Sequence, residues 1–148
     1  MHNTLSAAAR AAAALVCICA LGCADKSAPA EGRVKPRGRL LENGLPLKVD
    51  TTNMPPGDPG MKITFVRLGS ADAGEEIAAR IFEAAEGSFE LIGADGKGIP
   101  PGKYRVTVTV GPEGGADRLK GKYSRDKSKI EVEVKEGQDL VIDVASYK

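Results

Sequence analysis

The sequence is poor in the residues that most hydrolases use for catalysis. Its 148 residues include one histidine, three cysteines and no tryptophan, and aromatic residues make up only 4% of the chain. The histidine, His2, and all three cysteines lie within the first 23 residues. The remaining chain therefore offers no imidazole base and no thiol. Ser-His-Asp catalysis, Cys-His catalysis and an ordinary zinc site cannot be assembled from it.

An excess of charge of either sign is also absent. The chain has 21 Lys and Arg against 20 Asp and Glu, which gives a formal net charge of +1. A nucleic-acid-binding domain usually carries a clear basic excess. We therefore expect no nucleic-acid partner.

The start of the chain has the pattern of an export signal. Arg10 precedes an uninterrupted apolar run at residues 11–21, which is too short to cross a bilayer as a helix. The run leads to Gly22 and Cys23. This segment resembles a bacterial lipoprotein signal peptide, in which a small residue precedes the cysteine that receives the lipid. Cys23 fits that pattern, although Ala20 stands where the motif prefers leucine.

The resemblance implies that residues 1–22 are removed and that Cys23 is acylated. Cys17 and Cys19 follow the larger residues valine and isoleucine and do not fit the pattern. The mature protein would be exported and lipid-anchored in the cell membrane or outer membrane, facing the periplasm or the cell exterior. Several acyl chains, such as palmitate, on one cysteine hold a protein firmly. The alternative is an ordinary secretory signal with an incidental cysteine.

The rest of the chain divides into a tether and one domain. Residues 23–32 comprise the candidate lipidated cysteine and a small, polar, flexible segment. Residues 33–148 contain seven short strand patterns with turns between them and no certain helix, which predicts an all-β antiparallel sandwich. The expected strands cover residues 33–41, 61–68, 80–83, 89–91, 104–110, 130–134 and 140–144.

Residues 104–110 give the clearest of these patterns. Tyr104 and three valines alternate with Arg105 and two threonines, so one face of this strand belongs in a core. We expect it to be a central strand, preceded by a type II turn at Pro101 and Gly102. Phe65, Phe89 and Tyr104 are expected in the core.

Residues 75–85 are ambiguous. Ile77, Ile81, Ala84 and Ala85 have helical spacing. A strand at residues 80–83 is favoured, because a tight turn at residues 86–87 leads directly into the next strand.

Several of these segments together resemble a known domain. They are residues 43–47, 87–91, 99–106, 122–123 and 132–137. They are similar to segments of bacterial lipoproteins that carry a carboxypeptidase-regulatory-like domain, which has a transthyretin-like (prealbumin-like) fold. The likeness covers about residues 33–144. It implies the fold and a non-catalytic module rather than peptidase activity. At residues 83–86 this sequence lacks the aspartate-bearing turn usual in the family, so a metal role is not implied there.

Basic residues are the candidate contact sites. Four of them alternate along one strand, and Pro36 suggests that this strand lies at a sheet edge. Two more lie in the glycine-rich excursion at residues 111–128. Contact with anionic headgroups or an acidic envelope polymer would gain about 1 kcal/mol per nearby cation and would be screened by salt. The alternative is a solvated, charged edge that prevents aggregation. The residues are Arg33, Lys35, Arg37, Arg39, Lys120 and Lys122.

Carboxylates are the remaining catalytic candidates. A glycosidase needs two of them at a set separation across a cleft, and no spacing here indicates that. Residues 95–98 lack the spacing of a calcium loop and are expected to be a glycine-rich connection. The sequence therefore predicts a binding or structural module without catalytic residues, metal or cofactor. One alternative is an accessory subunit that pairs with an envelope protein through an edge strand, and another is a carboxylate-based hydrolase.

Overall fold

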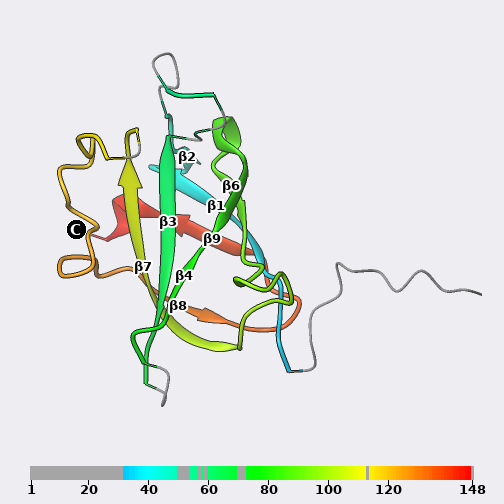
Figure 1. Cartoon of the computed structure of the whole chain (residues 1–148). Coiled ribbons are helices and arrows are strands. Elements are labelled where there is room, and N and C mark those ends of the chain that lie inside the picture. Colours follow the sequence, from blue (N-terminus) through cyan, green and yellow to red (C-terminus); the bar gives the residue numbers. More distant parts are fainter. Residues whose placement is uncertain are drawn as a thin grey trace, which may run out of the picture.

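Two β-sheets face each other in this protein (Figure 1). The computed structural model describes residues 32–49, 54–56, 58, 60–69, 73–112 and 114–147. The predicted signal peptide and Cys23 lie outside the described residues, as does nearly all of the tether. Within the described residues, no helix is both long enough and apolar enough to cross a membrane.

The described residues form nine strands and two short 3₁₀ turns. The five-stranded sheet has the order β2-β1-β6-β5, and β9 pairs with β1. The four-stranded sheet has the order β4-β3-β7-β8. The strands of the first sheet are β1 (Arg37–Glu42), β2 (Leu45–Pro46), β5 (Arg80–Glu83), β6 (Ser88–Glu90) and β9 (Leu140–Asp143). Those of the second are β3 (Met61–Arg67), β4 (Glu76–Ala78), β7 (Gly102–Val110) and β8 (Glu131–Val134).

The predicted all-β sandwich is confirmed, with two differences in detail. The strands number nine rather than seven, because Leu45–Pro46 pairs briefly with the end of β1 and the ambiguous segment contributes two strands. All strand pairs are antiparallel except β1 with β9, which run parallel.

Strand β7 is central in its sheet, as predicted. It lies between β3 and β8, and its alternate side chains from Tyr104 to Val110 are buried. Fully burying one valine side chain contributes roughly 1.5–3 kcal/mol, so this row is a large part of the core. The preceding turn differs from the prediction. Gly102 has a φ of 146°, far from the +80° of a type II turn, because it is already the first residue of β7.

The ambiguous segment crosses from one sheet to the other. β4 belongs to the four-stranded sheet and β5 to the five-stranded sheet, with only Ala79 between them. The strand at residues 80–83 is therefore confirmed. A single 3₁₀ turn, η1 (Ala84–Glu86), follows it and ends at Gly87 with a φ of 65°. A side chain at Gly87 would collide with the carbonyl oxygen of Leu40, so this tight turn requires glycine.

The prediction that the basic strand lies at a sheet edge is wrong. β1 pairs with β6 along one side and with β9 along the other. Pro36 is tolerated because it precedes the first paired residue, Arg37, so its missing N–H is not needed. Its carbonyl oxygen accepts the N–H of Leu91 at 3.0 Å. Gly38 lets β1 pack closely, since a side chain there would collide with the Phe89 ring.

Both sheets contribute to one core. Its largest fully buried side chains include the three aromatic residues expected there. The ring centroid of Phe65 lies 5.8 Å from that of Phe89 and 6.2 Å from that of Tyr104. The Tyr104 hydroxyl donates to the Pro100 carbonyl oxygen at 2.6 Å, which satisfies its polar end.

Candidate functional site

Two of the predicted contact residues are engaged in ion pairs. Arg33 Nη1 lies 3.1 and 3.2 Å from the two carboxylate oxygens of Asp95 and 3.3 Å from the Gly98 carbonyl oxygen. Arg39 Nη2 lies 3.8 Å from a carboxylate oxygen of Glu86, and both side chains are exposed. Part of the positive charge is therefore balanced within the domain.

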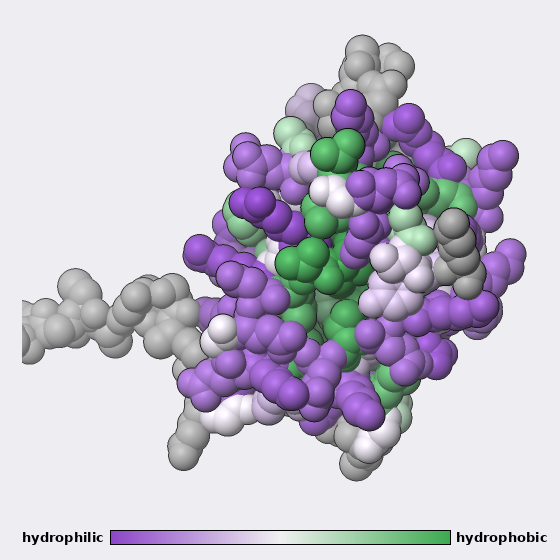
Figure 2. All heavy atoms as spheres, turned by 180° about the vertical axis from the view of Figure 1, so that it is seen from behind, coloured by the Kyte–Doolittle hydropathy of each residue, from purple (hydrophilic) through white to green (hydrophobic). Residues whose placement is uncertain are grey.

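Arg37 and Arg39 project from the outer face of the five-stranded sheet. This follows from their alternation with Gly38 and Leu40, which are buried. In the sheet, Arg37 stands opposite Glu90, so this face carries both signs of charge. Figure 2 shows apolar atoms gathered along the middle of this side of the molecule, surrounded by hydrophilic ones. The exposed large apolar side chains of the described chain all come from this sheet: Leu45, Phe82 and Val141.

Lys35 precedes β1, is half-buried and lines a second cavity, of about 330 Å³, together with Arg33 and Arg37. Lys120 and Lys122 belong to the excursion after β7, on the opposite side of Figure 1 from the blue start of the described chain. Lys122 Nζ lies 4.8 Å from the ring centroid of Tyr123. The six basic residues thus do not share one surface, and their contact with an anionic surface stays a prediction.

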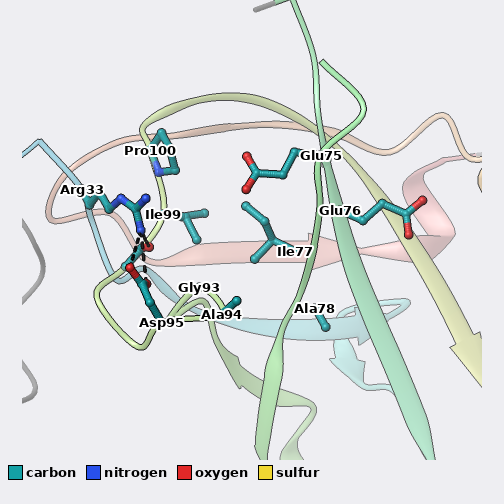
Figure 3. A pocket seen from close by; sticks show the side chains of 11 residues that line it. Arg33, Glu75, Glu76, Ile77, Ala78, Gly93, Ala94, Asp95, Ile99 and Pro100 are labelled. Atoms are coloured by element: carbon teal, nitrogen blue, oxygen red, sulfur yellow. Dashed lines mark hydrogen bonds and ion pairs between the residues drawn. The ribbon is translucent and has the colours of Figure 1, made fainter. Parts of the chain in front are cut away.

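A groove lies beside β4. It has a volume of about 500 Å³ and runs between β4 and the connection from β6 to β7. Figure 3 shows Ile77 and Ile99 turned toward each other at its centre, and the Arg33–Asp95 ion pair at one side. Glu75 is directed across the opening toward Pro100 (Figure 3). The remaining lining residues are Glu76, Ala78, Gly93, Ala94 and Gly98.

β4 presents an unpaired edge to this groove. Among the described strands it pairs only with β3. The N–H of Ala79 donates to Ile63, and the Glu75 carbonyl oxygen accepts from Arg67, both at 2.9 Å. In an antiparallel ladder such positions alternate with outward-facing ones. The backbone N–H and C=O groups of Glu76 and Ala78 therefore point away from β3, toward the groove.

The opposite wall is shaped by Asp95. Its carboxylate accepts the backbone N–H of Lys97 at 3.1 Å, and this hydrogen bond, with help from the charge of Arg33, lowers the pKa of Asp95. Gly93 and Gly98 both have positive φ, of 69° and 93°. The connection is thus a folded, glycine-dependent loop, as its sequence indicated, and its small residues leave the groove open.

Three carboxylate side chains line the groove, those of Glu75, Glu76 and Asp95. Glu75 and Glu76 are adjacent in sequence but point in opposite directions (Figure 3). Glu76 is bound by Arg125, with Oε1 and Nη1 2.6 Å apart. Among the described residues, the carboxyl groups with a clear pKa shift are Asp95, Asp117 and Glu133, and all three pKa values are lowered. A general acid of the glycosidase type needs a raised one.

No metal-binding cluster is present in the described part of the chain. No group of three or more aspartate, glutamate, histidine or cysteine residues lies close enough together there to hold an ion. This includes residues 83–86 and 95–98, the two turns considered from the sequence.

Comparison with known proteins gave no match. Neither a family model, nor a curated protein, nor a solved structure matched the chain. The functional argument therefore rests on the sequence pattern and on the geometry described above.

Proposed function

We propose that this protein is a lipid-anchored, non-catalytic module of the bacterial cell envelope with a binding or structural role. The observation that carries the proposal is the apolar run at residues 11–21, which is followed directly by Gly22 and Cys23. In the sequence, residues 24–32 lie between this cysteine and the predicted domain, so a tether of nine residues would separate the two. A folded domain directly after a lipidation motif is the expected arrangement for an anchored module.

The two-sheet sandwich supports the non-catalytic part of the proposal. It agrees with the resemblance to carboxypeptidase-regulatory-like domains of the transthyretin-like kind, which we propose as its family. Beyond Cys23 the chain has no histidine and no cysteine. The groove beside β4 has an apolar centre and an unpaired strand edge, and these features suit binding better than hydrolysis.

The anchor is tested by intact mass and membrane partitioning of the exported protein. We expect the wild type to begin at Cys23, to carry the added mass of its acyl chains and to sediment with membranes. A Cys23→Ser variant should lack that mass and that association. Cys19→Ser is the matched control, because it removes a neighbouring cysteine and should leave anchoring unchanged. An unmodified, soluble wild-type protein would show instead an ordinary secreted domain.

A further inference from the structure

We propose that the groove beside β4 binds an extended segment of a partner protein as an added antiparallel strand. The proposal deepens the binding role given above by naming the site and the kind of partner. It rests on three features of the groove that point to the same occupant.

The first feature is the unpaired backbone of β4. Glu76 and Ala78 direct two N–H and two C=O groups toward the groove, as the ladder with β3 requires. A strand laid beside β4 would extend the four-stranded sheet and satisfy these groups. Three residues of β4 offer about 10 Å of edge, which is enough for two hydrogen-bonded residue pairs.

The second feature is the shape and polarity of the groove. Ile77 and Ile99 form its apolar floor, while Ala78, Ala94 and Gly98 leave its walls low. In the added strand, the residue opposite Ile77 would point to the floor, and its two neighbours would point outward. The partner segment should therefore place an apolar residue between two polar ones.

The third feature is the charge at the opening. Glu75 is directed across the groove (Figure 3), where Arg33 is held by Asp95 and Arg67 lines the same opening. With Glu76 and Asp95 also among the lining residues, acidic groups outnumber basic ones around the groove. A basic residue at one end of the partner segment would meet the Glu75 carboxylate.

The other free edges of the described sheets are less suitable. β5 has an irregular register between Ile81 and Glu83, and such bulges discourage pairing. β9 is followed immediately by the 3₁₀ turn η2 (Val144–Ser146). β8 has outward backbone groups at Glu131 and Glu133, but the cavity beside it is only about 230 Å³. β8 therefore serves as the control edge.

The test uses a synthetic peptide with blocked ends and the sequence Lys-Thr-Val-Thr-Val-Thr-Lys. Its valines would face the floor and its threonine amides would pair with β4. The full chain, purified in detergent, is titrated with the peptide while hydrogen exchange is followed by NMR. We expect saturable binding and slower exchange of the amide protons of Glu76 and Ala78.

Ala78→Pro removes an outward N–H without breaking the ladder to β3, because proline is tolerated on the free side of an edge strand. We expect it to weaken peptide binding by about tenfold or more, the effect of losing hydrogen bonds and closing the approach to the edge. Glu133→Pro makes the same change on the β8 edge and should leave binding unchanged. Unchanged binding in Ala78→Pro, or lost binding in Glu133→Pro, would overturn the assignment to β4.

A second variant distinguishes loss of the binding site from a folding defect that Ala78→Pro could cause in β4. Ala94→Trp fills the groove from the opposite wall, where residue 94 is exposed, and should also abolish binding. Ala85→Trp, at an exposed position outside the groove, should not. Peptides provide a further control. N-methylation of the threonine amides should abolish binding, and N-methylation of the valine amides should not.

The outcome is separable from that of the anchor. Acylation of Cys23 is decided by mass, and peptide capture is decided on the same chain whether or not the lipid is present. Absence of peptide binding to the wild type would refute the strand-addition site and leave the anchor untouched. A soluble, unmodified chain that still bound the peptide would refute the anchor alone.

Discussion

In each of the two connections that flank β7, one aspartate accepts backbone N–H groups, but the two aspartates accept different numbers of them. Before β7, Asp95 accepts one backbone N–H, from Lys97, and pairs with Arg33 at an exposed position. After β7, Asp117 accepts three backbone N–H groups, from Val110, Leu119 and Gly121, at 3.0, 3.0 and 2.8 Å. The first connection borders an open groove, whereas the second is fastened to the end of β7.

The difference shows that neither length nor charge determines how firmly a connection is hydrogen-bonded to the sheets. The excursion at residues 111–128 is the longer and more highly charged of the two. It nevertheless runs alongside β7, because the Val108 N–H donates to the Tyr123 carbonyl oxygen at 3.1 Å. The Tyr123 hydroxyl donates to the Val144 carbonyl oxygen at 2.6 Å and so ties the excursion to the other sheet. We expect the two aspartates to differ accordingly in their effect on stability.

The largest effect on stability is expected for Asp117→Ala. It leaves three backbone N–H groups without their charged acceptor, and we expect the free energy of unfolding to fall by about 2 kcal/mol. Urea unfolding at neutral pH measures this loss. Asp126→Ala is the control, since it removes the same charge from an exposed position in the same excursion. A loss no greater than that of the control would show that the excursion is held by other contacts.

The pH dependence of that loss is the next test. Burial of the Asp117 carboxyl group opposes ionisation, but the three N–H donors outweigh burial, and the pKa lies below its ordinary 3.8. The stabilisation is therefore fully present above about pH 4 and is lost as the pH falls through the lowered pKa. Unfolding measured from pH 7 to pH 2 should show the wild type and Asp117→Ala converging in acid. If the difference in free energy of unfolding between the two proteins stayed constant over this pH range, the ionised carboxylate would have no role in stability.

The smallest effect is expected for Asp95→Ala. The ion pair with Arg33 is exposed, and exposed pairs contribute little to stability. The urea midpoint should shift less than in Asp117→Ala, while hydrogen exchange of the Lys97 amide should become faster. A shift as large as that of Asp117→Ala would mean that the wall of the groove is as firmly built as the excursion.

The features of the fold that depend on local alternation of apolar and polar residues could be predicted from the sequence. β7 and the buried aromatic residues follow from period-two patterns and the small number of large apolar residues. The location of β1 did not follow, because Pro36 is compatible both with an edge strand and with the residue before an internal one. Only the pairing of β1 with β9, about a hundred residues later, distinguishes the two.

The groove could not be predicted for a similar reason. Its unpaired edge depends on the order of strands in the four-stranded sheet, and its opposite wall comes from a distant connection. Isoleucines at positions 77 and 99 carry no signal that they meet. The role of Asp117 could not be predicted either, because the sequence around an aspartate in a charged excursion does not indicate that three backbone N–H groups will donate to it.

The parallel pairing of β1 with β9 has a consequence for how the protein reaches its folded state. Gly38 stands opposite Leu140, so the first strand of the described domain completes its ladder only with the last. Contacts between such distant positions close late and slow the search for the native topology. In a chain that crosses a membrane starting from its N-terminus, β1 would emerge first, and one of its edges would stay unpaired until β9 had emerged. If the protein is exported as proposed, its domain would close only after the last strand had crossed.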